Sequence, residues 1–177
     1  MHRQAFSIML WLVVFSSMPA HRAEAQLENL LGSGPEVETI SVGELKALLD
    51  RQQEREAAAA KSGQEKPAAD FVLVDVRSEE EVDVSVIPGA IPKAEYEANR
   101  DRYRGRTVIA YCTVGGRSAR YASELKKSGV PVKNFKGSIL QWVDAELPLV
   151  TLDGKSTRRV HTYSDRYKVP AKYEAVW

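Results

Sequence analysis

The sequence predicts an α/β fold in which helices cover both faces of a parallel sheet. The first observation is a pair of short, continuous apolar runs, 71–74 and 107–111, that are rich in strand-favouring residues. Runs of this kind are typical of strands buried on both faces, as the strands of parallel sheets are. The second observation is that segments with helical apolar spacing alternate with these runs, which is the pattern that builds such a sheet.

Capping residues and apolar spacing place the individual elements along the chain. A first helix is expected after Ser41, because Ser41 and Glu44 have capping-box spacing and leucines follow at helical intervals into the alanines at 57–60. Ser78 and Glu81 form a second capping box for a short helix after the strand at 71–74. The other expected elements are a polar loop at 61–67, a turn at 87–90, a strand at 91–94, helices at 97–103, 118–128 and 139–143, and a strand at 130–135.

Length, charge and cysteine content limit the classes of protein that this chain can belong to. Its 177 residues suit one domain of ordinary size. Lys and Arg number 25 against 24 Asp and Glu, a balance that argues against nucleic-acid binding through a basic face. A single Cys cannot form an internal disulfide. With His161 as the one His beyond the first 25 positions, we expect neither a metal site nor a cofactor.

Residues 1–25 have the pattern of a secretory signal peptide. Arg3 precedes an apolar run that ends near Met18, Pro19 interrupts it, and Ala23-Glu24-Ala25 offers the small-x-small pattern of a cleavage site. The run is shorter than the roughly 20 apolar residues of a membrane span, although an uncleaved membrane anchor remains the alternative. We therefore expect export to the periplasm or the medium, with no stable membrane insertion after cleavage at Ala25.

The expected organisation after this segment is a linker at 26–39, one domain at 40–147 and an irregular extension at 148–177. The extension lacks periodicity but is rich in aromatic residues, so it is expected to pack back on the domain. His161 lies within it. A Cys–His hydrolase would need this His beside the Cys as its base, but Asp165 is the one nearby carboxylate that could orient it. We expect His161 to serve packing instead.

Cys112 directly follows the strand at 107–111 and is the candidate nucleophile. The carboxyl edge of a parallel sheet is where ligands bind, and inward-facing amides before a helix form an anion nest. We expect the loop amides and Arg117 to keep the thiol ionised at neutral pH without a general base. The alternative is a small, buried and inert Cys. The candidate anion-binding loop comprises Thr113, Val114, Gly115, Gly116, Arg117 and Ser118.

Four stretches, taken together and in this order, resemble the rhodanese domain family. They are FVLVDVR at 71–77, IPGAIP at 87–92, YCTVGGRS at 111–118, and NFKG at 134–137 with the residues up to Trp142. The resemblance covers about 40–147 and implies a three-layer fold with a central five-stranded parallel sheet and helices on both faces. It also implies a sulfurtransferase in which the Cys112 thiolate takes up a sulfane sulfur as a persulfide. The acceptor would be a thiophilic small molecule or a protein thiol.

The same resemblance leaves alternatives to this activity. The loop from Cys112 to Arg117 has six residues, as is typical of the family, whereas related phosphatases and arsenate reductases use seven. A Cys-dependent phosphatase or arsenate reductase is therefore one alternative. A rhodanese-like binding module that carries a sulfur or senses oxidants without useful turnover is the other. Thr113 stands where thiosulfate-using members often carry a basic residue, so the resemblance does not single out thiosulfate as the donor.

Two further features of the resemblance concern structural support. Asp75 and Arg77 end a buried strand and are expected to pin it to a neighbouring loop rather than to take part in chemistry. The paired glycine that usually precedes the closing helix is here Gly137-Ser138.

Overall fold

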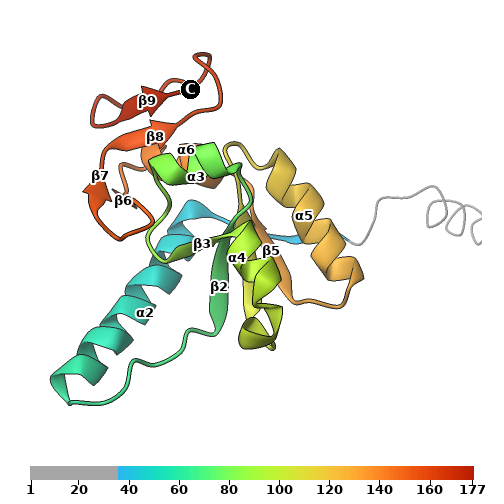
Figure 1. Ribbon diagram of the computed structural model, residues 1–177, viewed down its shortest axis with the longest axis vertical. Helices are drawn as coiled ribbons and strands as arrows, with labels where there is room; N and C mark the ends of the chain where they lie inside the picture. The colour runs from blue at the N-terminus through green and yellow to red at the C-terminus, as the bar shows by residue number, and fades with distance from the viewer. Residues whose placement is uncertain (1–35) are drawn as a thin grey trace, which may run out of the picture. The chain divides into compact units, whose positions relative to one another are not determined.

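A five-stranded parallel sheet organises residues 36–177, the part of the chain that the computed structural model describes (Figure 1). Its strands lie in the order β1-β5-β4-β2-β3, and each neighbouring pair is parallel. The predicted fold class is confirmed. The predicted signal peptide and residues 26–35 of the linker predicted at 26–39 lie outside the described residues. The strands are β1 (Glu38–Ile40), β2 (Phe71–Asp75), β3 (Ala90–Pro92), β4 (Thr107–Tyr111) and β5 (Val132–Phe135).

Helices cover both faces of this sheet and give the structure three layers. In chain order they are α2 (Val42–Lys61), α3 (Glu79–Val84), α4 (Lys93–Ala98), a 3-10 turn (Arg100–Tyr103), α5 (Gly116–Lys127) and α6 (Ser138–Asp144). The core on one face includes side chains of α2 and α6, and the core on the other includes side chains of α4 and α5. No helix within residues 36–177 is long and apolar enough to cross a bilayer.

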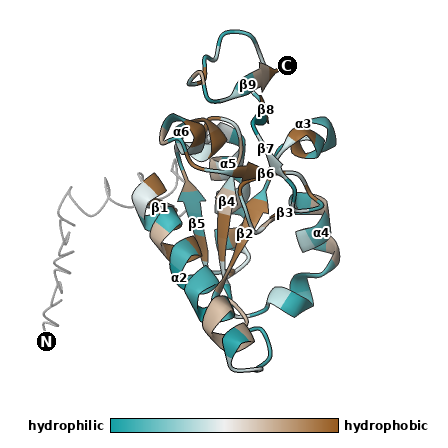
Figure 2. Ribbon diagram, turned by 90° about the vertical axis from the view of Figure 1, so that its left-hand side faces the viewer, coloured by the Kyte–Doolittle hydropathy of each residue, from teal (hydrophilic) through white to brown (hydrophobic). Residues whose placement is uncertain are grey.

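Successive side chains of a strand point to opposite faces of the sheet, and both faces are buried, so the strand sequences are continuous apolar runs. Leu73 and Ile109 belong to the core beneath α2 and α6, whereas Val72 and Val74 belong to the core beneath α4 and α5. The brown, apolar stretches of the central strands in Figure 2 show this composition. Both faces of the sheet are therefore buried, and its carboxyl edge is where functional side chains can gather.

Several element boundaries differ from the predicted ones for local reasons. The helix predicted at 118–128 begins at Gly116, because Gly115 adopts a left-handed conformation (φ +100°) that lets it cap the helix two residues earlier. The helix predicted at 97–103 is α4 followed by the 3-10 turn. The Asn99 side-chain amide donates to the Glu95 carbonyl at 2.9 Å and ends α4 there. The short strand β1 was not predicted, and it extends the domain into the expected linker.

The C-terminal segment, residues 148–177, is not irregular as predicted. It forms two small sheets: β6 (Leu149–Val150) pairs antiparallel with β7 (Ser156–Thr157), and β8 (Arg159–His161) pairs parallel with β9 (Glu174–Val176). The lack of periodicity that suggested irregularity reflects strands of two or three residues, which are too short to show alternation.

Buried contacts fix the C-terminal segment on the domain, at the end of the sheet where the strands finish (Figures 1 and 2). Leu149, Val160 and Tyr173 are buried in the core beneath α2 and α6. Val150 exchanges two backbone hydrogen bonds with Val86, at 2.7 and 3.1 Å. The segment is therefore part of the fold.

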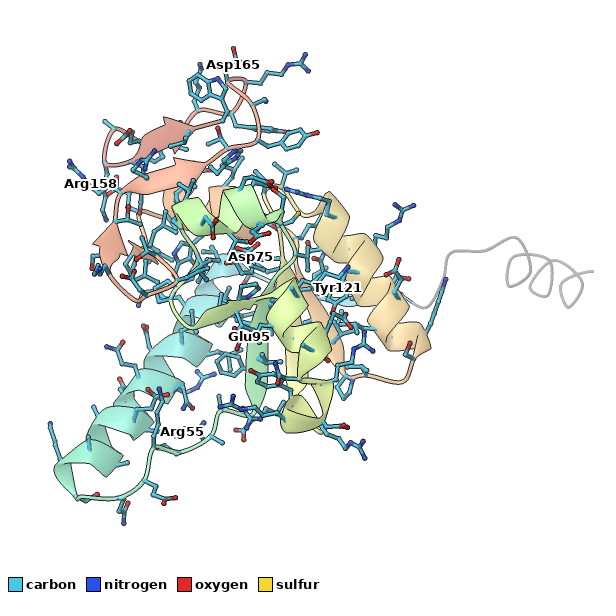
Figure 3. All side chains as sticks on the ribbon, viewed as in Figure 1. Arg55, Asp75, Glu95, Tyr121, Arg158 and Asp165 are labelled. Atoms are coloured by element: carbon cyan, nitrogen blue, oxygen red, sulfur yellow. The ribbon has the colours of Figure 1, made fainter. Side chains whose placement is uncertain are left out.

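A buried ion pair closes the carboxyl end of β2, where Figure 3 labels Asp75. Arg77 Nε donates to Asp75 Oδ1 at 2.9 Å and Nη2 donates to Oδ2 at 2.6 Å, with both side chains fully buried. Arg77 Nη2 also donates to the Ser85 carbonyl at 2.6 Å. The pair thus ties the strand end to the loop after α3, which supports the structural role expected for both residues.

We predict that Asp75→Ala lowers the free energy of unfolding by about 3–5 kcal/mol, because it leaves the Arg77 guanidinium buried without its counter-charge. Urea denaturation measures the loss. The matched control is Asp101→Ala, which removes an ion pair to Arg104 whose side chains are 91% and 83% exposed and should change stability by less than about 1 kcal/mol. A variant that kept the parental stability but lost iodoacetamide reactivity at Cys112 would contradict the structural role.

Candidate functional site

Cys112 lies between the end of β4 and the N-terminus of α5, with its sulfur surrounded by hydrogen-bond donors. The Gly115 N–H donates to Sγ at 3.0 Å. The hydroxyl oxygens of Ser118 and Ser138 lie 3.7 and 3.8 Å from Sγ. The residue is only 1% exposed, so these groups take the place of water as partners of the sulfur.

This arrangement lowers the pKa of the Cys112 thiol. Burial acts in the opposite direction and is the largest single influence, since it disfavours the charged thiolate. Hydrogen bonds from the Ser118 backbone and hydroxyl, and from the Gly115 and Val114 amides, outweigh it. The N-terminus of α5 points the positive end of its dipole at the same place. The sulfur therefore sits in a nest of N–H groups, as the sequence predicted.

Gly115 is indispensable to this nest for two reasons. Its φ of +100° lies in the region that side chains disfavour, and a Cβ on it would lie 2.0 Å from the Lys136 carbonyl oxygen. The loop thus approaches the backbone before α6 too closely for any side chain. That close approach aims the Gly115 amide at the sulfur.

Ser138 occupies the second position of the expected glycine pair and has the matching left-handed conformation, φ +55°. Its hydroxyl donates to the Phe135 carbonyl at 2.9 Å and accepts the Cys112 N–H at 3.0 Å. The two bonds tie the start of α6 to the base of the loop and offset the backbone strain. Sequence reasoning treated this position as a structural departure and missed its contact with Cys112.

Arg117 interacts with Glu81 more strongly than with the sulfur. Its Nη1 and Nη2 donate to the two carboxylate oxygens of Glu81 at 2.6 and 2.8 Å. Thr113 completes the cluster: its hydroxyl donates to Glu81 at 2.7 Å and accepts from Arg117 at 2.8 Å. Glu81 is the main cause that raises the pKa of Arg117, and the charge of the Cys112 thiolate raises it further. Arg117 therefore favours the thiolate, as expected, but the loop donors contribute more.

Sequence reasoning gave Glu81 only a capping role in α3. The structure confirms that role, with the Ser78 N–H donating to Glu81 at 3.1 Å, and adds the contacts to the loop. Burial raises the pKa of this carboxyl, but the hydrogen bonds from Arg117, Thr113 and Ser78 prevail and lower it from 4.5 to about 2. No spacing in the sequence links Glu81 to Arg117, which lies on a different helix. Only the packing of α3 beside the loop reveals the pair.

The C-terminal segment supplies the outer wall of the site. A cavity of about 260 Å³ opens at the sulfur, and Tyr163 and Tyr167 line it from the connection between β8 and β9. The Arg117 guanidinium lies 5.6 Å from the centre of the Tyr163 ring. The aromatic content of the segment was noted in the sequence, but not its position here. The other lining residues are Cys112, Thr113, Val114, Gly116 and Arg117.

His161 is not hydrogen-bonded to Cys112. Its Nδ1 accepts the Tyr163 N–H at 3.1 Å, which supports the expected packing role within the C-terminal segment. Within residues 36–177, no group of three or more His, Cys, Asp and Glu side chains is placed to hold a metal ion.

The Glu81 carboxylate should make the stability of the protein depend on acid pH. Its pKa is lower in the folded state than the usual 4.5, so its stabilisation is complete above pH 4.5 and is lost as the pH falls toward 2. Because Arg117 is 41% exposed, solvent screening limits the effect to about 1–2 kcal/mol. Glu81→Gln should therefore be less stable than the parent at pH 7 and equally stable near pH 2.

Urea denaturation between pH 2 and pH 7 tests this. The control is Glu79→Gln, an exposed position in the first turn of the same helix, which should change stability by less than about 0.5 kcal/mol. A stability difference between parent and Glu81→Gln that stayed constant across the range would show that the ion pair does not stabilise the fold.

Known proteins share both the fold and the sequence pattern of this chain. The family model described as the rhodanese-like domain matches residues 56–145. The tRNA uridine(34) hydroxylase of Burkholderia ambifaria (strain MC40-6) is 32% identical over 124 residues, which are 64% of this chain and 39% of that protein. The tRNA sulfurtransferase of Desulfurococcus amylolyticus is 34% identical over 73 residues, which are 41% of this chain and 15% of that protein. The chain thus spans less than half the length of these relatives.

Among solved structures, the thiosulfate sulfurtransferase from Pseudomonas aeruginosa superimposes with a TM-score of 0.51 at 23% identity. The match covers 67% of this chain and 21% of that one, and at this identity it shows the shared fold. The family model covers half of the present sequence, including β2, the Cys112 loop and α6. The chain therefore belongs to the rhodanese-like domain family.

Proposed function

We propose that this protein is a sulfurtransferase that carries a sulfane sulfur on Cys112. The observation that carries the proposal is the set of donors around Sγ: the Gly115 N–H at 3.0 Å and the hydroxyl of Ser118 at 3.7 Å, at the N-terminus of α5. These donors stabilise a thiolate without a base. A persulfide bears its charge on the terminal sulfur, next to the same donors, so the loop suits both forms of the enzyme.

The transfer consists of two displacements at sulfur. In the first, the Cys112 thiolate attacks the sulfane sulfur of a donor, an S–S bond forms to Cys112, and the donor leaves as an anion with the electron pair of its broken bond. In the second, the acceptor thiolate attacks the outer sulfur of the persulfide, and Cys112 leaves as a thiolate. Neither displacement requires proton transfer, which agrees with His161 being engaged by Tyr163 instead of Cys112.

The Arg117–Glu81 pair favours sulfur transfer over phosphate chemistry. A phosphatase or arsenate reductase needs cationic groups for an oxyanion with two charges, whereas Arg117 already donates to both oxygens of Glu81. In a module without turnover, Cys112 could take up a sulfur but would not pass it to an acceptor. The lowered pKa of Cys112 makes it a good leaving group for that second step, and its position in a cavity gives an acceptor access.

Intact-mass spectrometry after exposure to sulfur donors tests the proposed function. Incubation with a polysulfide or an organic thiosulfonate should add the mass of one sulfur atom, and a thiol acceptor or cyanide should then remove it. Cys112→Ser should gain no mass under either condition. An aryl phosphate serves as the probe for the phosphatase alternative.

If the protein steadily released phenol from the aryl phosphate and took up no sulfur, we would conclude that it is a phosphatase and not a sulfurtransferase. A persulfide that forms on Cys112 but passes to no thiol or cyanide would leave only a binding or sensing module.

Export is a second part of this proposal, supported by the charged start, apolar run and small-x-small pattern of residues 1–25. Expressed in a Gram-negative host, the protein should appear in the periplasmic fraction and should begin at Gln26 on N-terminal sequencing. Replacing two residues of the apolar run, Leu10 and Val13, by Asp should keep it in the cytoplasm. An exported form that still began at Met1 would show that the segment is not cleaved.

A further inference from the structure

The cavity above Cys112 has mainly apolar walls. Val114, which is 47% exposed, lines it together with Tyr163 and Tyr167. Exposed apolar side chains grouped around a reactive atom are typical of a surface that packs against a ligand. The two tyrosines come from the C-terminal segment, after the residues that the family model matches.

The single positive charge at the cavity is already paired. Arg117 is the one charged residue among the lining residues, and its guanidinium donates to Glu81 at 2.6 and 2.8 Å. Thr113, the residue after the nucleophile, is buried and is bound to the same carboxylate. A donor with two negative charges would meet the loop amides and one paired cation, whereas an apolar group would meet Val114 and the two tyrosines.

The backbone of Tyr163 has an unusual conformation that its neighbours maintain. Tyr163 has a φ of +70°, which a residue with a side chain rarely adopts. Its N–H donates to His161 Nδ1 at 3.1 Å, and the neighbouring Thr162 is fully buried and bonded to the Val176 carbonyl. A strained conformation that the surroundings maintain, and that places a ring at the site, points to a role in function.

From these contacts we infer that Tyr163 and Tyr167 select substrates: the cavity takes sulfur compounds whose sulfane sulfur is attached to an apolar, above all aromatic, organic group. The inference rests on the proposed sulfurtransferase function and names its substrate class. His161 acts as a positioning residue, because it fixes the turn that carries Tyr163.

Two thiosulfonates form a matched pair of probes. Benzenethiosulfonate and methanethiosulfonate carry the same single charge and the same transferable sulfur, and they differ only in a phenyl or a methyl group. In both cases the Cys112 thiolate attacks the terminal sulfur, a Cys–S–S⁻ persulfide forms, the S–S bond of the donor breaks, and a sulfinate anion leaves. The reactants and the products of this step each carry a total of two negative charges.

The measurement is the second-order rate of persulfide formation on Cys112, followed by intact mass in a single turnover. The ratio of the rates for the two donors is divided by the same ratio for a small thiol in solution, which removes intrinsic reactivity. The parent should prefer the phenyl donor by about tenfold, the order of magnitude that burial of a ring instead of a methyl group gives.

Substitutions at the two tyrosines test whether their rings cause this preference. Tyr163→Ala/Tyr167→Ala should bring the corrected ratio to about unity, whereas Tyr163→Phe/Tyr167→Phe should keep it, because the rings and not the hydroxyls make the contact. Trp177→Ala is the control, since Trp177 is 67% exposed in the same segment and does not line the cavity. Tyr163 is 68% and Tyr167 36% exposed, and urea denaturation should confirm that their removal leaves the fold intact.

The outcomes separate this inference from the proposed function. If both donors load Cys112 with a corrected ratio near unity in the parent, or if the double Ala variant keeps the preference, aromatic selection is wrong while sulfur transfer stands. If neither donor loads Cys112, the proposed function itself fails. His161→Ala should lower the preference for the phenyl donor without changing the rate for the methyl donor. If it lowered the rates for both donors equally, His161 would not be a positioning residue for Tyr163.

Discussion

The reactive state of Cys112 depends mainly on backbone amides and a serine hydroxyl that converge on its sulfur, and these contribute more than the neighbouring charge of Arg117. These donors come from the turn at Gly115 and the first turn of α5, and they overcome the burial that would otherwise keep the thiol neutral. The surrounding structure holds that turn in place. Gly115 lies against the Lys136 carbonyl, and Ser138 bonds to the Cys112 backbone. Sheet, loop and α6 therefore act together to position one sulfur atom.

The main elements of the fold follow from the sequence because they depend on local signals. The strands β2 and β4 are continuous apolar runs, and Ser41 and Glu44 mark the start of α2. The position of Cys112 at the carboxyl edge follows from the same signals. Contacts between distant segments do not follow from them. Glu81 meets Arg117 across 36 positions, and Tyr163 meets Arg117 across 46, with nothing in the spacing to indicate either contact.

Pairing with Glu81 changes the part that Arg117 takes in the site. Sequence reasoning assigned it a permanent positive charge beside the thiolate, and the structure makes it in addition a cross-link between α3, the loop and the Tyr163 ring. The site then combines backbone amides that stabilise the sulfur with apolar residues that line the cavity. The C-terminal segment, which was predicted to be irregular, builds part of this lining through its β8–β9 connection.

The pH dependence of Cys112 alkylation by iodoacetamide tests the central claim most directly. The parent thiol should titrate below the value of about 8.5 that is usual for a free Cys. Ser118→Ala should raise this pKa, because it removes one of the hydrogen bonds that lower it. The double variant Glu81→Gln/Arg117→Gln, which removes two opposite charges together, should raise it less than Ser118→Ala does, because the loop donors contribute more than Arg117. A parent value at that of a free Cys, or a larger rise in the double variant than in Ser118→Ala, would contradict stabilisation of the thiolate by the loop.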